Sequence, residues 1–219
     1  MSPKPIPVPK EPFFILLCLI SGLLVLVTIL NRFFAARIFL DIFLAAIAIS
    51  MVYTISRKKG PLIVGLLLAI VMLASQWLQY SHQNKEIAAI GMIAGVLFTA
   101  MVITNIMVFM IKSEEVNREV IYAAILLYLL VALMWAFVYT FLELVDPTSF
   151  NITLSQPQGY LLVFQYYSVI TITTLGYGDI APVTEVAKAF AALEALVGQL
   201  YLVVVVAWLV GMHVSKKSK

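Results

Sequence analysis

Long runs of apolar residues, separated by short polar connections, extend over most of the chain. A membrane-spanning helix needs about 20 mostly apolar residues. Six runs come close to or exceed this length: residues 13–31, 36–56, 61–80, 87–111, 119–143 and about 187–213. Residues 158–170 form another apolar run, which is too short to cross a bilayer. The pattern predicts six transmembrane helices and, between the last two, a short helix that enters the membrane partway before the chain returns.

The composition places most of the chain in a bilayer. The 219 residues are 63% hydrophobic and only 11% charged, whereas a soluble domain of this size would need many more charged residues to cover its surface. Backbone polar groups inside a membrane must be bonded within helices, so we expect an all-α membrane protein. The net charge of +3 is small and does not indicate a nucleic-acid partner.

Lysine and arginine residues in the short connections predict the orientation, because cytoplasmic loops carry an excess of them. If both termini are cytoplasmic, ten of the fourteen lie inside, and four, Arg32, Arg37, Lys85 and Lys188, lie outside. We therefore expect a multi-pass protein of the cell membrane with both termini in the cytoplasm.

The same pattern divides the chain into five parts. They are an N-terminal cytoplasmic segment (1–12), a four-helix membrane domain (13–112), a cytoplasmic linker (113–118), a domain containing the last two spans and the short helix (119–213), and a cytoplasmic tail (214–219). A voltage sensor needs repeated Arg or Lys on its fourth span, and residues 87–111 contain neither. The four-helix domain is predicted not to sense voltage.

The most specific motif is Thr-Ile-Thr-Thr-Leu-Gly-Tyr-Gly-Asp-Ile at residues 171–180. Glycine reaches unusual backbone angles at little steric cost, so Gly176 and Gly178 allow successive carbonyl groups to turn to one side. A column of carbonyl oxygens can replace the hydration shell of a K⁺ ion. A Gly-x-Gly arises often by chance, whereas this longer motif between two apolar spans is far more specific.

The motif closely resembles the selectivity filter of tetrameric six-span potassium channels, with Leu175 where that family has Val. The detailed resemblance covers residues 158–211, and the first four spans match the family only in number. It implies a homotetrameric pore in lipid, K⁺ as the permeant ion and no cofactor. The implied K⁺ ligands are Thr174, Leu175, Gly176 and Tyr177, with a further carbonyl from Gly178.

Two acidic residues are candidates for supporting this filter. In the resembled family, the aspartate after the filter bonds an aromatic residue of the short helix, and we assign these roles to Asp179 and Tyr167, with Tyr166 beside it. The alternative is that Asp179 is only a solvated charge. Glu194 lies within the last span, where an ionisable residue is expensive to bury. It either braces the filter from behind or faces an aqueous crevice.

The last span also contains a candidate hinge and gate. Gly198 either bends the helix, as a glycine does in the resembled pores, or allows close helix packing. Gln199, Leu202, Val206 and Val210 recur on one face, which we assign to the cavity. Val206 and Val210 would then narrow the inner mouth, where apolar rings can gate by excluding water.

The sequence therefore predicts passive, K⁺-selective conduction. A non-selective cation channel is the first alternative, although Tyr177, which such channels typically replace, is intact. A membrane subunit of a potassium uptake system is the second. No metal-ligand cluster or phosphate loop supports an enzyme, and the sequence does not identify a regulatory subunit. Asn151-Ile-Thr153 also fits the N-glycosylation pattern, which three residues can match by chance.

Overall fold

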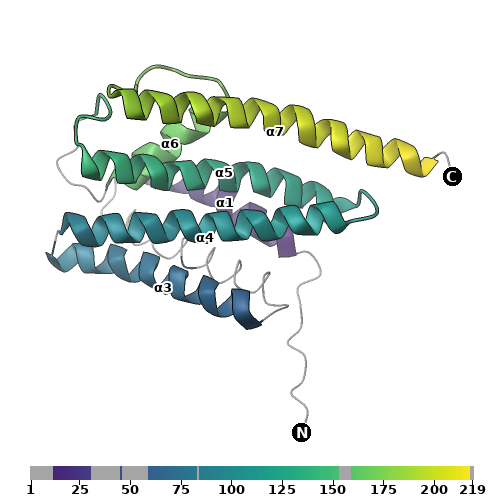
Figure 1. Cartoon of the computed structure of the whole chain (residues 1–219), viewed down its shortest axis with the longest axis horizontal. Helices are drawn as coiled ribbons and strands as arrows, with labels where there is room; N and C mark the ends of the chain where they lie inside the picture. Colours follow the sequence, from purple (N-terminus) through teal and green to yellow (C-terminus); the bar gives the residue numbers. More distant parts are fainter. Residues whose placement is uncertain (1–11, 31–44, 46–58, 83, 153–158, 218–219) are drawn as a thin grey trace, which may run out of the picture.

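The computed structural model describes residues 12–30, 45, 59–82, 84–152 and 159–217. Its helices, labelled in Figure 1, are α1 (Pro12–Leu30), α3 (Lys59–His82), α4 (Lys85–Lys112), α5 (Arg118–Val145), α6 (Tyr160–Ile172) and α7 (Glu185–Lys217). The predicted span at residues 36–56 lies, apart from Ala45, outside the described residues. Within the described ranges there is no strand, and an isolated β-bridge joins Phe150 and Pro182.

Four of these helices are long and apolar enough to cross a membrane. The qualifying segments are Pro61–Leu78 of α3, all of α4, all of α5, and Glu185–Val214 of α7. Each matches a predicted run to within a few residues, because runs of this length and hydrophobicity can satisfy their backbone groups in a bilayer only as helices. The chain is an all-α membrane protein.

Asparagine caps define where two of the spans begin. The side-chain oxygen of Asn84 accepts a hydrogen bond from the backbone N–H of Glu86 at 2.8 Å, directly before α4. Asn117 does the same for Val120 at 3.0 Å, directly before α5. Each cap satisfies one of the N–H groups that have no partner within the helix. The connection between α4 and α5 consists of residues 113–117.

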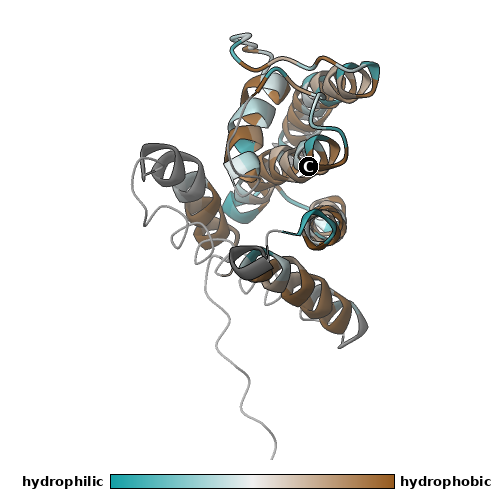
Figure 2. Ribbon diagram, turned by 90° about the vertical axis from the view of Figure 1, so that its left-hand side faces the viewer, coloured by the Kyte–Doolittle hydropathy of each residue, from teal (hydrophilic) through white to brown (hydrophobic). Residues whose placement is uncertain are grey.

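Helix α5 forms the centre of the bundle. Helices α1, α4, α6 and α7 all pack against it, and α3 packs on the far side of α4 (Figure 1). Leu126, Leu130, Ala136 and Phe137 of α5 are completely buried. Many large apolar side chains of the helices are exposed in the protomer, and the helices are coloured mostly as hydrophobic in Figure 2. This arrangement is expected where lipid replaces water around the protein.

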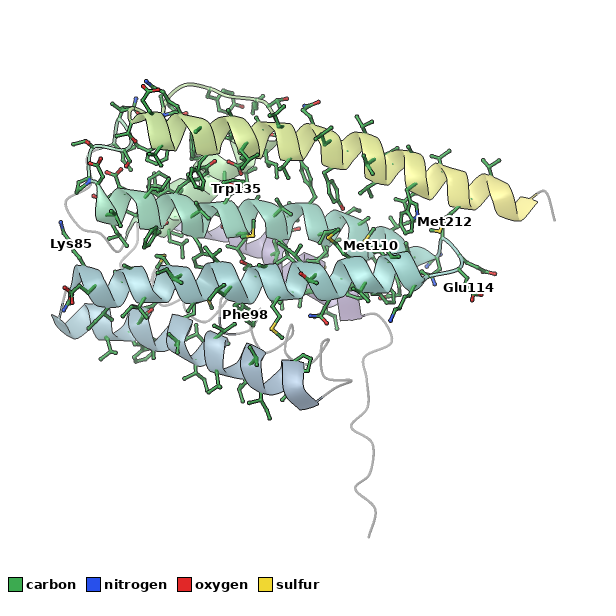
Figure 3. All side chains as sticks on the ribbon, viewed as in Figure 1. Lys85, Phe98, Met110, Glu114, Trp135 and Met212 are labelled. Carbon is green, nitrogen blue, oxygen red and sulfur yellow. The ribbon has the colours of Figure 1, made fainter. Side chains whose placement is uncertain are left out.

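Both ends of the described chain lie at one side of the bundle. At the start of α1, the ring of Phe13 lies 4.8 Å from that of Phe109 near the end of α4, and Phe14 lies 5.2 Å from Tyr122 near the start of α5. Helix α7 runs antiparallel to α5 and ends at the same side. Met212 of α7 and Glu114 of the α4–α5 connection mark this end in Figure 3.

Candidate functional site

Helix α6 and the segment after it form a loop that starts and finishes at the same end of α5. At 13 residues, α6 is about 20 Å long, which is shorter than the roughly 30 Å hydrocarbon core of a bilayer. The chain then returns, and the backbone N–H of Val183 donates to the carbonyl of Ser149 at 2.8 Å. The sequence motif thus lies between the short helix α6 and residue Val183, which is hydrogen-bonded to the segment before α6.

The motif itself has an unusual backbone. Gly176 and Gly178 have φ angles of 52° and 78°, in the left-handed region that glycine enters without steric cost. Thr174 has a φ of 60°, which costs a residue with a side chain about 1–2 kcal/mol. Its hydroxyl is held on both sides, because it donates to the carbonyl of Thr173 at 2.7 Å and accepts from Gln199 at 3.2 Å.

Three backbone N–H groups of this segment donate hydrogen bonds back to α6. Those of Leu175 and Gly176 donate to the carbonyl of Ile170 at 2.9 and 3.1 Å, and that of Thr174 donates to Thr171 at 2.9 Å. Within the described residues, no hydrogen bond is donated to the carbonyls of residues 174–178. We call residues 174–178 the filter segment, after the role that the sequence predicts for them. Its carbonyl oxygens are available to a ligand outside the protomer's own hydrogen-bond network.

Asp179 is bonded to Tyr166, so the assignment of its partner to Tyr167 was wrong. The Tyr166 hydroxyl donates to the Asp179 carboxylate at 2.8 Å. Neighbouring residues on a helix point about 100° apart, so only one of the two tyrosines faces the returning chain. Tyr167 is instead buried among aromatic rings. Their centroids lie 5.1 Å from it for Tyr139, 5.3 Å for Phe150 and 6.4 Å for Phe164.

Glu194 of α7 is completely buried in the protomer and joins three helices. Its carboxylate accepts from the Tyr139 hydroxyl of α5 at 2.6 Å and from the Ser168 hydroxyl of α6 at 2.5 Å. Ser168 also lies 2.7 Å from the carbonyl of Ala132, and its single hydrogen serves one of these acceptors at a time. This is the geometry of a brace behind α6 and not of a residue in an aqueous crevice.

Gly198 brings α7 against the end of α6. A Cβ at this position would lie 2.3 Å from the carbonyl oxygen of Ile172, well inside contact distance. The same oxygen accepts from the Tyr128 hydroxyl of α5 at 2.9 Å. Helix α7 continues through Gly198 from Glu185 to Lys217. Of the two interpretations of Gly198, the packing contact favours close approach over a bend.

The four residues assigned to the cavity face, Gln199, Leu202, Val206 and Val210, are all exposed in the protomer. A different face of α7 packs against the bundle, through Tyr201, Val205 and Trp208. The Tyr201 hydroxyl donates to the carbonyl of Ala124 at 2.5 Å and fixes this side toward α5. The assigned face is therefore free to face other molecules.

The structural roles of two residues at the site were not predicted from the sequence. Glu143, near the end of α5, is 1% exposed, and its carboxylate accepts from the backbone N–H of Phe150 at 3.2 Å. Asn151 bonds Ala181 through its side chain at 2.6 Å. The position of Glu143, an acidic residue at the end of an apolar run, could have indicated a buried and hydrogen-bonded carboxylate. Nothing in the local pattern connected Asn151 with a residue thirty positions later.

No group of three or more His, Cys, Asp or Glu side chains suited to a metal ion occurs among the described residues. Outside the membrane segments, the pKa of Asp146 lies below its usual value, because the hydroxyl and the backbone N–H of Thr148 donate to its carboxylate. The polar groups of the site are backbone carbonyls, hydroxyls, the buried carboxylates of Glu143 and Glu194, the exposed carboxylate of Asp179, and the amide side chains of Asn151 and Gln199.

The fold and the site define a helical membrane protein with a short helix and a glycine-rich return segment between two spans. Residues 125–214 match a family model described as "Ion channel". The match includes most of α5, all of α6, the filter segment and nearly all of α7, and covers less than half of the chain. No curated protein and no solved structure matches the chain. The family match supports an ion channel and points to a membrane transport protein rather than an enzyme.

Proposed function

We propose that the chain is the subunit of a homotetrameric, K⁺-selective channel that conducts passively across the cell membrane. The observation that carries the proposal is the filter segment. The N–H groups of Thr174, Leu175 and Gly176 are bonded back to α6, while the carbonyls of residues 174–178 accept no hydrogen bond within the described residues. Selectivity filters for K⁺ are built from rings of such carbonyls, four chains around one axis.

The chemistry of dehydration explains why four chains are needed. A K⁺ ion leaves water when oxygens replace its hydration shell, and a single extended chain contacts the ion from one side only. Four copies of residues 174–178 would surround it, with the Thr174 hydroxyl and carbonyl at the innermost site. Leu175 and Tyr177 are 55% and 67% exposed in one protomer, which supports a packing role for them against neighbouring copies.

The predicted orientation comes from the distribution of Lys and Arg along the chain. With both ends of the chain on the cytoplasmic side, as the Lys and Arg distribution favours, the filter segment lies toward the outside of the cell. The loop of α6 and residues 173–180 then enters the membrane from outside and returns there. The exposed face with Gln199, Leu202, Val206 and Val210 would line the inner cavity.

A flux measurement in vesicles tests the proposal. Purified protein in vesicles loaded with K⁺ and diluted into Na⁺ should pass K⁺ and leave the vesicle interior electrically negative. Gly176→Ala should abolish this flux, because alanine is strained at a φ of 52°. Gly211→Ala is the matched control, since a Cβ there meets nothing within 4 Å. Equal fluxes of K⁺ and Na⁺ through the wild-type protein would favour a non-selective cation channel.

A further inference from the structure

The chain segments on either side of α6 and the filter segment are paired with each other. The backbone N–H of Asn151 donates to the carbonyl of Ala181 at 3.1 Å, and the N–H of Ala181 donates to the side-chain oxygen of Asn151 at 2.6 Å. The bridge of Phe150 with Pro182 lies between these bonds and that of Val183 with Ser149. We call this pairing of residues 149–151 with residues 181–183 the outer clamp.

One side of the outer clamp is fixed to the protein core. Phe150 is 3% exposed, and its ring lies 4.6 Å from Phe164 and 5.3 Å from Tyr167, both on α6. Its N–H donates to the buried carboxylate of Glu143. Because Phe150 is held by α5 and α6, the adjacent Asn151 presents its side chain to Ala181 from a rigid support.

The other side of the outer clamp follows the filter segment directly. Ala181 is two residues beyond Asp179, which the Tyr166 hydroxyl holds from α6. The filter segment has little packing of its own in a protomer, since a Cβ built on Gly176 or Gly178 meets nothing within 4 Å. Its conformation therefore depends strongly on how its two ends are held.

The geometry points to Asn151 as a positioning residue of the filter, which holds the returning chain through its side-chain oxygen. This inference rests on the proposed function, because it concerns the stability of a conducting filter. It gives Asn151 a structural role that uses its side-chain oxygen and is separate from the glycosylation pattern at residues 151–153.

Three substitutions separate the roles of this side chain. Asn151→Ala removes the acceptor for the Ala181 N–H, Asn151→Asp retains an acceptor oxygen, and Thr153→Ala destroys the glycosylation pattern while leaving Asn151 in place. Single channels in planar bilayers would be recorded over a range of K⁺ concentrations. Bound K⁺ stabilises the conducting filter by mass action, so a loosened filter needs more K⁺ to conduct steadily.

Asn151→Ala should raise the K⁺ concentration for half-maximal conducting time about fivefold, the change expected from one hydrogen bond of average net strength. Asn151→Asp and Thr153→Ala should stay close to the wild type, and the size of the assembled protein should not change. Wild-type behaviour of Asn151→Ala, or an equal shift in Asn151→Asp, would overturn the inference.

Amide hydrogen exchange of the wild-type protein tests the same bond without any current. The Ala181 amide should exchange slowly, and it should exchange faster in Asn151→Ala. Fast exchange of Ala181 in the wild type would overturn the inference even if a variant failed to assemble. If the wild-type channel proved not to select K⁺, the proposed function would fail, while the exchange measurement would still decide whether Asn151 holds the return segment.

Discussion

Two adjacent tyrosines of α6 have different environments. The Tyr166 hydroxyl reaches Asp179 beyond the filter segment, whereas the Tyr167 ring is buried against Tyr139 and Phe150. A hydrogen bond to a charged acceptor contributes about 1.5–3 kcal/mol, roughly twice the value of a neutral one. Tyr166 is therefore the residue through which α6 holds the outer end of the filter segment.

Replacing each tyrosine by phenylalanine tests this difference. Tyr166→Phe removes the donor to Asp179 and should shorten the conducting periods of single channels about tenfold or more. Tyr167→Phe keeps its ring among the aromatic side chains and leaves the Asp179 bond intact, so it should behave much more like the wild type. The opposite order of effects would restore the original assignment to Tyr167.

Removing the Glu194 carboxylate should destabilise the protein. Glu194→Ala leaves the Tyr139 hydroxyl without its buried acceptor, and an unsatisfied buried group costs about 1–3 kcal/mol. The Ser168 hydroxyl keeps the Ala132 carbonyl as an acceptor, but its bond from α6 to α7 is lost. The thermal midpoint of the assembled protein should fall by several degrees, and less in Glu194→Gln, which keeps one acceptor oxygen. An unchanged midpoint in Glu194→Ala would show that the carboxylate does not brace α6.

Sequence reasoning found the residues whose chemistry depends on the local pattern. Gly176 and Gly178 occupy the left-handed backbone region that their spacing predicted, and Glu194 was recognised because an acid inside an apolar span is expensive. Whether Tyr166 or Tyr167 bonds Asp179 depends on how α6 is rotated about its axis. The sequence pattern does not indicate this rotation. The role of Asn151 depends on its contact with Ala181, thirty positions later, which the local sequence does not reveal.

The contact between α6 and α7 depends on the absence of a side chain. Gly198 lies against the carbonyl of Ile172, where a Cβ would approach to 2.3 Å, and Tyr128 donates to the same oxygen. These contacts place α7 directly behind the start of the filter segment. The glycine thus determines how closely the two helices approach.

Gly198→Ala should push α7 away from α6. Overpacking of this kind typically costs about 1–3 kcal/mol, which should lower the thermal midpoint of the assembled protein. Gly211→Ala on the same helix has open space around its Cβ and should be neutral or slightly stabilising, because alanine favours a helix by up to about 1 kcal/mol over glycine. Equal effects of the two substitutions would contradict the packing role of Gly198.

The bounds of the long helices were predicted well because hydrophobicity is a local property of the sequence. The runs at residues 61–80, 87–111 and 119–143 correspond to α3, α4 and α5. The last run ends at residue 213, whereas α7 continues to Lys217. Helical hydrogen bonding can continue beyond the apolar segment into Ser and Lys residues, so hydropathy marks where a helix contacts lipid and not where it stops.

In the proposed tetramer, neighbouring copies would supply contacts that one protomer lacks. Helix α7 has large apolar side chains without cover in the protomer, among them Leu193, Leu196, Leu200 and Val203. In the proposed tetramer, α7 and the filter segments of four copies surround a common axis. Val206 and Val210, about two and three turns beyond Gly198, would then form the narrowest apolar ring of the inner cavity.

Two neighbouring valines test the predicted gate. Val206 is 55% exposed, whereas Val205 packs against the bundle. Val206→Asp should keep the apolar ring hydrated and raise the fraction of time that single channels are open. Val205→Asp should mainly lower thermal stability, because it buries a charge. A higher open fraction in Val205→Asp alone would place the cavity on another face of α7.

The reversal potential under bi-ionic conditions tests the central claim most directly. Purified wild-type protein would be placed in a planar bilayer with K⁺ on one side and the same concentration of Na⁺ on the other. Carbonyl sites that fit K⁺ predict a current that reverses far from zero, with the K⁺ side negative. A current that reverses near zero would contradict a K⁺-selective filter at residues 174–178.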